Sequence, residues 1–216
     1  MQDLHLIYDT AFFRQWGRGN ADYVRSAEII AGALFNLFKP KSLADLGCGC
    51  GVYAHIFKAK GVPVLAVDGV QPPREHAFSL PIVVRDLTAP VENIWGMFDL
   101  ALCLEVAEHI PEELSGVFLD NIVKFSGRLA MSAAPPGQDG HHHVNERPKR
   151  YWARKLAGKG FVYNRRETGR LMEALKKPKP PLMWMANHIS VYEKTSDPLK
   201  LRHGVPFQGN PGSPAL

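Results

Sequence analysis

Short apolar runs alternate with longer segments of helical spacing along most of the chain. Between Asn20 and Pro40, apolar residues recur at intervals of three and four, which predicts a helix over 20–38 with Asn20 as its N-cap. The other expected helices are 52–60, 112–125, 147–157 and 166–176. The short apolar runs are expected to be strands, at 43–46, 64–67, 82–84, 98–104, 129–133, 161–163 and 182–192. This alternation predicts an α/β doubly wound domain.

Length and composition set the expected number of domains. The chain has 216 residues, of which 45% are hydrophobic, enough for one sizeable core but cramped for a second domain. We therefore expect one domain over 1–194. From Thr195 on, Pro, Gly, Ser and Asn dominate without periodicity, so 195–216 is expected to be a flexible tail.

Apolar runs and cysteines indicate the compartment. No run approaches the roughly 18 residues that cross a bilayer, and the first residues lack the basic and then apolar order of a signal peptide. The three cysteines form no disulfide framework and no C-x-x-C pair. A soluble, cytoplasmic protein in a reducing compartment is the expectation.

The net charge of +5 is unevenly distributed. Twelve Lys and Arg residues fall within 147–179, against Glu167 and Glu173. Such a cluster can bind the phosphates of nucleic acid or a lipid surface, or it can be an ordinary solvated face of two helices. It lacks the aromatic interleaving of RNA-binding modules. Nucleic acid is therefore the lesser alternative as a partner, and no membrane partner is expected.

A glycine-rich stretch after the run 43–46 carries the first chemical signal. Gly47, Gly49 and Gly51 alternate directly before a segment of helical spacing, which predicts a strand, a tight turn and a helix. Glycines there let the backbone approach a ligand closely, and the N–H groups of the new helix point at it. The dinucleotide fingerprint G-x-G-x-x-G would need glycine at Val52, so that fingerprint is excluded.

Two stretches resemble a known superfamily. Asp45 to Gly51 resembles motif I of class I S-adenosylmethionine (SAM) dependent methyltransferases, an acid, one apolar residue and then G-x-G-x-G, with Cys50 where Thr or Ser is more usual. The segment 98–111 resembles the post-motif I and motif IV region of the same superfamily, in the right order and spacing. The resemblance implies a Rossmann-like, mostly parallel seven-stranded sheet with a reversed C-terminal strand. It also implies SAM as the cofactor and S-adenosylhomocysteine (SAH) as its product.

The expected cofactor-binding residues lie at the ends of the first four strands. They are Asp45, Gly47, Cys48, Gly49, Gly51, Tyr53, Asp68, Gly69, Asp86, Leu87, Leu104 and Glu105. Asp68 lies about 20 residues beyond the turn, where an acid at the end of a second parallel strand meets a ribose. A carboxylate can accept from both ribose hydroxyls. The alternative is a turn aspartate before Gly69.

The adenine end is assigned by the resemblance, and the methionine end by the position of the loop after the fourth strand. The resemblance implies that Asp86 accepts from the adenine amino group and that Leu87 packs on the ring, the alternative being a carboxylate that caps its own loop. Ligands of open parallel sheets bind outside the carboxyl ends of the strands, so Leu104 and Glu105 are expected to face the methionine part of SAM. Glu105 as a helix cap is the alternative.

The loop 135–145 contains three consecutive histidines, His141 to His143. Consecutive side chains diverge, whereas metal sites draw on spaced ligands, so no metal is expected. Gly140 to Glu146, followed by Tyr-Trp and Gly-Phe, resembles a subset of small bacterial and phage methyltransferase-domain proteins. In it His143 and Asn145 take the matching positions, while His141 and His142 are additions whose role stays open.

Candidate catalytic and substrate residues follow from this loop and from the N-terminus. An oxygen or nitrogen acceptor must lose a proton, for which His has a suitable pKa. His143 is the first candidate base and His109 the second, with a structural role the alternative for His109. The aromatic set within 8–16 either covers one edge of the core or closes the pocket as a flap. For the flap, Tyr8 and Phe12 are the candidate substrate contacts, together with Asn145.

The resulting expectation is transfer of the SAM methyl group to a hydroxyl or amine of a small molecule or sugar. One alternative is an RNA or tRNA methyltransferase that uses the basic stretch 147–179, although no Asn/Asp-Pro-Pro-Tyr/Phe motif for base amino groups follows the fourth strand. The other is a protein that binds SAM without transferring methyl. Oligomeric state is not indicated.

Overall fold

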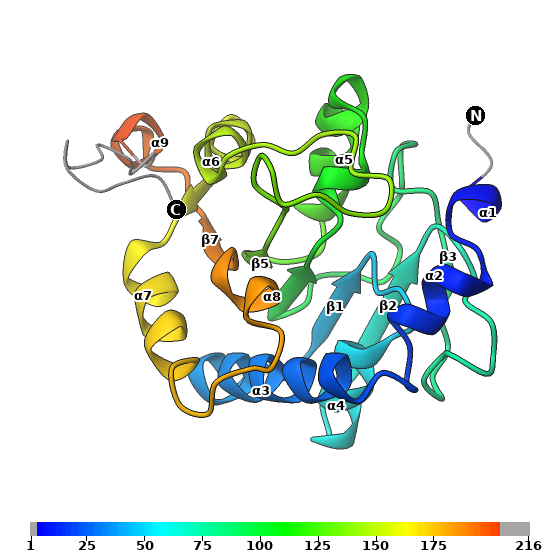
Figure 1. Ribbon diagram of the computed structural model, residues 1–216. Helices are drawn as coiled ribbons and strands as arrows, with labels where there is room; N and C mark the ends of the chain where they lie inside the picture. The colour runs from blue at the N-terminus through cyan, green and yellow to red at the C-terminus, as the bar shows by residue number, and fades with distance from the viewer. Residues whose placement is uncertain (1–3, 204–216) are drawn as a thin grey trace.

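The computed structural model describes residues 4–203, and a seven-stranded sheet forms its centre (Figure 1). The strands are β1 Leu43–Leu46, β2 Val64–Asp68, β3 Val83–Val84, β4 Leu100–Cys103, β5 Arg128–Met131, β6 Phe161–Tyr163 and β7 Ser190–Lys194. Their order in the sheet is β3-β2-β1-β4-β5-β7-β6. Strands β1 to β5 pair in parallel, and β7 runs antiparallel to both β5 and β6. The predicted Rossmann-like sheet with a reversed C-terminal strand is confirmed.

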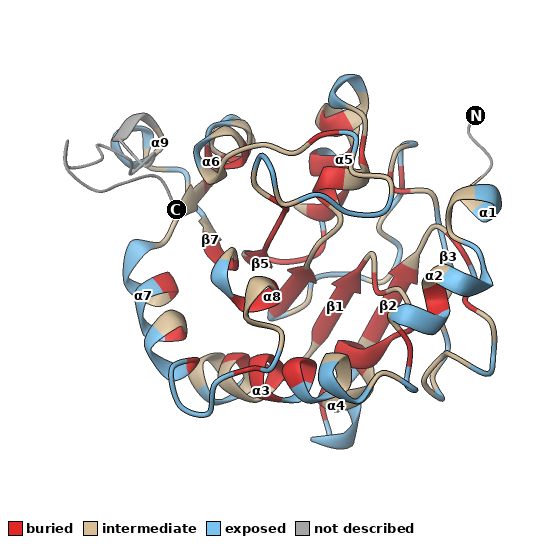
Figure 2. Ribbon diagram, in the orientation of Figure 1, coloured by how far each residue is buried: buried red, intermediate tan, exposed pale blue. Residues whose placement is uncertain are grey.

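Helices cover both faces of the sheet, and each face has its own apolar core. The helices are α1 Leu4–Ile7, α2 Thr10–Gln15, α3 Ala21–Phe38, α4 Val52–Ala59, α5 Ser115–Ile122, α6 Lys149–Ala157, α7 Arg165–Ala174, α8 Met183–Asn187 and α9 Pro198–His203. Helices α3, α4, α7 and α8 contribute to one core, and α5 and α6 to the other. Figure 2 shows the buried surfaces of these helices turned toward the sheet.

Strand alternation explains the two cores. In β1, Leu43 packs with α3 and α4, whereas Ala44 and Leu46 pack on the opposite face, because successive side chains of a strand point to opposite faces. All four residues of β1 are buried. A parallel strand covered on both faces is expected to read as a continuous apolar run, and in β1 this run is interrupted only by the buried Asp45.

Helix α3 begins and ends as its sequence predicts. The Asn20 side chain accepts from the backbone N–H of Tyr23 at 3.0 Å, which caps the first turn. The helix ends at Lys39 in the left-handed conformation, directly before Pro40. Its buried stripe, including Ile30 and Leu34, packs against β1 and α4, and truncating either side chain to Ala would cost about 2–5 kcal/mol.

One predicted element is wrong. The segment 182–192 was expected to be a single strand, but it forms helix α8 and then the shorter strand β7. Length and periodicity cannot separate a buried helical turn from a strand in a short apolar run. Here Met185 and Ala186 are buried against α3, and the Leu182 N–H donates to the Ser26 hydroxyl of that helix. This tertiary contact decides the helical conformation.

Smaller differences occur at other boundaries. The helix expected over 112–125 begins with a 3-10 turn at Glu112–Leu114, followed by α5. In the expected tail, α9 occupies Pro198–His203 and lies near β6, while 204–216 fall outside the described residues. Among the helices of residues 4–203, none combines the length and the hydropathy that a membrane span needs.

Candidate functional site

A cavity of about 890 Å³ opens at the carboxyl ends of the parallel strands. Its walls are the glycine turn after β1, the loops after β2, β3 and β4, the segment 138–143, and the N-terminal helices α1 and α2. Ligands of open α/β sheets bind at this edge. The loop between β5 and α6 reaches this edge in Figure 1, opposite α2.

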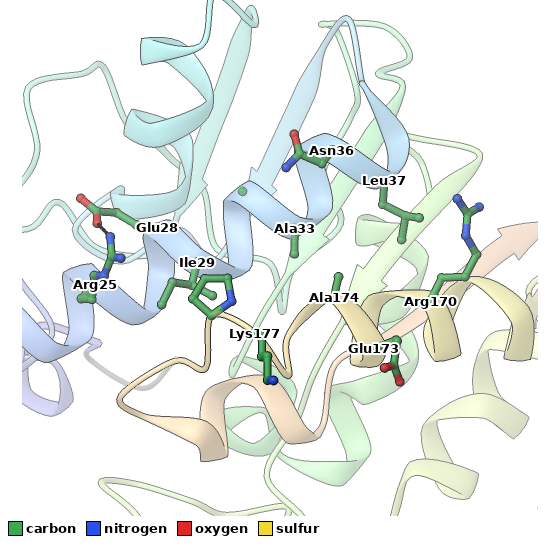
Figure 3. A pocket seen from close by; sticks show the side chains of 12 residues that line it. Arg25, Glu28, Ile29, Ala33, Asn36, Leu37, Arg170, Glu173, Ala174 and Lys177 are labelled. Atoms are coloured by element: carbon green, nitrogen blue, oxygen red, sulfur yellow. Dashed lines mark hydrogen bonds and ion pairs between the residues drawn. The ribbon is translucent and has the colours of Figure 1, made fainter.

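A second hollow, of about 730 Å³, lies between α3 and α7 (Figure 3). Its lining includes Ile29, Ala33 and Leu37, and its charged rim residue Arg25 pairs with Glu28 at 2.9 Å. No residue predicted to bind cofactor or substrate is among its described lining residues. The cavity at the strand ends is therefore the candidate functional site.

The glycine turn is shaped by backbone hydrogen bonds. The N–H groups of Gly47 and Cys48 both donate to the Val67 carbonyl oxygen, at 2.8 and 3.0 Å, so the turn is fixed on β2. Gly47, Gly49 and Gly51 have φ of 78°, 54° and 82°. Glycine adopts this region at little cost. A Cβ on Gly47 would lie 2.4 Å from a methyl carbon of Val106, whereas one on Gly49 would meet nothing within 4 Å.

The carboxylate of Asp68 joins the turn to the end of β2. Its Oδ2 accepts from Gly49 N–H at 2.7 Å, and its Oδ1 accepts from Val70 N–H at 3.0 Å. Burial raises the pKa of Asp68, although these hydrogen bonds oppose the shift. A carboxylate oxygen can accept more than one hydrogen bond, and this side chain lines the cavity.

Asp45 lies beneath the turn. It is buried and accepts from Ala54 N–H in the first turn of α4 at 3.1 Å. Burial raises the pKa of Asp45 to about 7, the Ala54 hydrogen bond opposes this, and the negative charge of Asp68 adds to it. The side chain thus ties β1 to α4 as well as lining the cavity.

The loop after β3 brings Asp86 and Leu87 to the cavity. The Asp86 Oδ1 accepts from both the N–H and the hydroxyl of Thr88, at 2.8 and 2.6 Å. Asp86 therefore caps its own loop, as the alternative reading expected, and it does so with Oδ1 and not with Oδ2. From α5, the Asn121 amide donates to the carbonyl oxygens of Leu87 and Ala89 at 2.8 and 2.7 Å, which fixes this loop.

Two carboxyl groups lie side by side after β4. Glu105 has φ of 55°, and its Oε2 accepts from the Gln138 amide at 3.2 Å. Glu108 is 0% exposed. The Glu105 carboxyl and the backbone N–H groups of Glu108 and Ala134 are near the Glu108 carboxylate, but neither of its oxygens accepts a well-formed hydrogen bond within residues 4–203. Burial raises the pKa of both carboxyls, and for Glu108 the charge of Glu105 raises it further.

His109 and His143 meet beside this carboxyl pair. Their ring centroids lie 5.0 Å apart. His143 Nδ1 is 2.9 Å from Glu146 Oε1, and His109 Nδ1 is 3.3 Å from the His142 carbonyl oxygen. Burial lowers the pKa of His109 to about 4, with the nearby charge of His143 adding to the effect. With a proton on Nδ1, each ring keeps its free lone pair on Nε2.

The loop 135–145, called the histidine loop below, is attached to the 3-10 turn Ala107–His109 by backbone hydrogen bonds. The N–H groups of Val144 and Asn145 both donate to the Glu108 carbonyl oxygen, at 3.0 and 2.9 Å. The side chain of Asn145 donates to the Ile110 carbonyl oxygen at 2.9 Å and accepts from Arg147. Asn145 is thus buried in the loop's attachment and does not line the cavity.

The N-terminal aromatic residues cover the cavity from the other side. Tyr8 lies 5.0 Å from Phe12 and 5.8 Å from His109, measured between ring centroids. His141 Nε2 contacts the Ile7 carbonyl oxygen at 2.6 Å, which joins the two covering segments. Phe13 packs inward with Cys50 and Val70. The aromatic set therefore has contacts of both expected kinds. Phe13 packs on the edge of the core, and Tyr8 and Phe12 form part of the cavity wall.

Most predicted site residues come together at this one cavity. Those that line it are Tyr8, Phe12, Asp45, Gly47, Cys48, Gly49, Tyr53, Asp68, Gly69, Asp86, Leu87, Leu104, Glu105, His109 and His143. Gly51 is buried at the N-cap of α4 and, like Asn145, does not line it. Sequence reasoning missed Glu108 and Gln138 as site residues. Glu108 stood within the recognised pattern 105–109, and nothing local indicated Gln138.

Sequence comparison finds relatives over part of the chain. No family model matches. The ubiquinone biosynthesis O-methyltransferase of Pseudomonas aeruginosa is 30% identical over 119 residues, covering 51% of this chain and 47% of the relative. The enzyme of the same name from Escherichia coli is 27% identical over 190 residues, covering 84% and 70%. The chain spans about half the length of the Pseudomonas relatives that it matches.

Structure comparison shows the same fold in solved methyltransferases. The 1,6-didemethyltoxoflavin-N1-methyltransferase of Burkholderia thailandensis, solved with SAH, has a TM-score of 0.58 at 18% identity and covers 90% of each chain. The sugar N-methyltransferase KedS8 of Streptoalloteichus has a TM-score of 0.60 at 15% identity, covering 86% of this chain and 92% of that one. In sequence and in fold together, the chain is similar to class I SAM-dependent methyltransferases.

Proposed function

We propose that this protein binds SAM in the cavity at the strand ends and transfers its methyl group to a hydroxyl or amine of a small molecule or sugar, releasing SAH. The observation that carries the proposal is that the glycine turn with Asp68 and the histidine loop line the same cavity. A donor held by the first would therefore present its methyl group to an acceptor held near the second.

The cofactor is assigned to the half of the cavity next to β1 and β2. Asp68 keeps lone pairs for the ribose hydroxyls, and Gly49 leaves open space above the turn. Asp86 and Leu87 are proposed to hold the adenine ring, and Leu104 and Glu105 the methionine part. The fold supports this reading, since the Burkholderia neighbour was crystallised with SAH.

The acceptor is assigned to the half enclosed by α1, α2 and the histidine loop. Tyr8 and Phe12 offer aromatic faces there, and a cavity of about 890 Å³ suits a small ligand beside the cofactor. The names of similar proteins support a small acceptor, because they include ubiquinone biosynthesis and sugar methyltransferases. None of the basic residues of 147–179 lines the cavity, so they lend no support to an RNA substrate at this site.

Methyl transfer from SAM requires the protein to align the reacting atoms and to remove a proton from the acceptor. A sulfonium is already an activated methyl donor, so the protein holds the nucleophile, carbon and sulfur in line and excludes water. His143 is the preferred base, because its contact with Glu146 orients the ring. His109 is the weaker candidate, since a pKa of about 4 leaves little driving force for taking a proton at neutral pH.

Calorimetric titration with SAM and SAH tests the proposal. We expect one site per chain, with affinity falling at least tenfold in Asp68→Ala, because a hydrogen-bonded charged group contributes about 1.5–3 kcal/mol. Asp68→Asn keeps one acceptor oxygen and should lose less. Asp22→Ala on α3, outside the cavity, is the control. Folded wild-type protein that binds neither compound would contradict the proposal.

A further inference from the structure

We infer that Glu108, His109 and His143 form a binding site for a divalent cation at the acceptor end of the cavity. One potential ligand atom from each residue lies within 4.8 Å of those of the other two. All three residues line the cavity. From the sequence no metal was expected, because the side chains of three adjacent histidines diverge. The cluster in the structure contains only one histidine of that run, His143, and its other two members lie more than thirty residues earlier in the chain.

The spacing of the three groups suits a cation after a small adjustment. Ligand atoms about 2.1 Å from a zinc ion stand roughly 3.4 Å apart in tetrahedral geometry. The three atoms here, which lie within 4.8 Å of one another, therefore need to close by at most about 1.4 Å. His143 lies in a loop and His109 on a short 3-10 turn, where rotation of a ring suffices for such a movement.

The unsatisfied carboxylate of Glu108 is the independent observation that points to a ligand. This side chain is 0% exposed, and neither oxygen accepts a well-formed hydrogen bond in the described part of the chain. Buried polar groups are nearly always paired, and a buried charge costs several kcal/mol unless it is paired or bound to a metal. A bound cation would satisfy Glu108 and relieve its repulsion with the adjacent Glu105.

Both histidines are arranged as metal ligands usually are. The Nδ1 atom of each ring faces an oxygen, Glu146 Oε1 for His143 and the His142 carbonyl for His109. A metal-binding histidine usually donates its other N–H to a carboxylate or a carbonyl, which fixes the ring and its tautomer. The Glu146 carboxylate is itself held by the N–H of Gly137 at 2.7 Å.

The donor set selects the class of ion. Imidazole with carboxylate suits Zn²⁺, Mn²⁺ or Fe²⁺, whereas Mg²⁺ and Ca²⁺ prefer oxygen ligands alone. Three protein ligands leave coordination positions open toward the cavity, as in catalytic rather than structural sites. The oxygen of an acceptor could occupy one of them.

The role of this cation, unlike the binding itself, rests on the proposed function. A bound cation lowers the pKa of a coordinated hydroxyl, which loses its proton to solvent. The resulting oxyanion attacks the methyl carbon, the carbon–sulfur bond breaks, and SAH leaves. An imidazole lone pair on a cation is not available for a proton, so the ion would replace the histidine base.

Titration of chelator-treated protein with MnCl₂ and with ZnCl₂ tests the site. We expect one ion per chain, bound at least tenfold more weakly in Glu108→Gln and in His143→Ala. The matched control is His141→Ala, which removes an exposed histidine of the same run and should leave affinity within twofold. Circular dichroism and melting temperature show whether each variant is folded, and His143→Ala, in a loop, serves if the buried Glu108→Gln does not fold.

Two outcomes overturn the inference. One is the absence of stoichiometric binding by folded wild-type protein. The other is binding that survives Glu108→Gln and His143→Ala but is lost in His141→Ala, which would indicate a surface histidine site. SAH titration of the same chelated protein separates the proposals, because failure to bind SAH contradicts the methyltransferase assignment and leaves the cation result standing.

Discussion

The glycine turn and the histidine corner line one cavity and are built in opposite ways. The turn, residues 47–51, is contiguous, and its form comes from backbone N–H groups and positive φ angles. The corner joins 105–109 to 137–146, and its chemistry lies in side chains. A contiguous backbone motif carries its geometry in the local sequence. A corner assembled from two segments acquires its geometry only when the sheet and both loops are in place.

The largest effect is expected where the two regions touch, in Gly47→Ala. A Cβ there would lie 2.4 Å from a Val106 methyl carbon, at φ of 78°. Left-handed backbone costs about 1–2 kcal/mol and overpacking about 1–3 kcal/mol more. We expect SAH affinity to fall about a hundredfold in calorimetry.

Gly49→Ala is the matched control, since it has the same strain without the clash. The double variant Gly47→Ala with Val106→Ala should recover part of the affinity. Equal losses in the two single variants would show that the contact between the regions is unimportant.

The next effect belongs to the histidine corner alone. His143→Ala should lower turnover at least tenfold while SAH affinity stays within twofold, because the base or cation ligand is lost and the cofactor half is untouched. Gly140→Ala should act in the same direction and more weakly, since its Cβ would lie 2.4 Å from His143 Nε2. The control is His55→Ala on α4, outside the cavity. Unchanged turnover in His143→Ala would show that His143 takes no part in methyl transfer.

The smallest effect concerns stability on the glycine side. Asp45 has its pKa raised to about 7 by burial, so the folded protein holds a proton that the unfolded chain releases near pH 4. Its contribution to stability is therefore present at low pH and is lost as pH rises toward 7. Asp45→Asn has no such group. Relative to this variant, the wild-type free energy of unfolding in urea should fall by at least about 1 kcal/mol between pH 4 and pH 7. A constant difference would contradict the raised pKa.

The predictable parts of the molecule were those with local signals. The helix start at Asn20, the strand before the turn and the acid at the end of β2 follow from capping, periodicity and spacing. The corner could not be predicted in the same way. Glu108 is recognisable as a partner of His143 only once the backbone bonds from Val144 and Asn145 bring the loop onto its turn. The sequence also predicted a substrate contact for Asn145, whose amide is used in that attachment.

The pairing of Trp16 with Trp184 has a practical consequence. The two indole rings meet edge to face with centroids 5.6 Å apart, join α2 to α8, and both line the cavity. They are two of the four tryptophans in the chain. Any ligand that parts α2 from α8 on entry must separate them and change their emission. The protein thus carries an intrinsic fluorescent reporter in the wall of its own cavity, so that a movement of α2 against α8 can be timed in solution without a label.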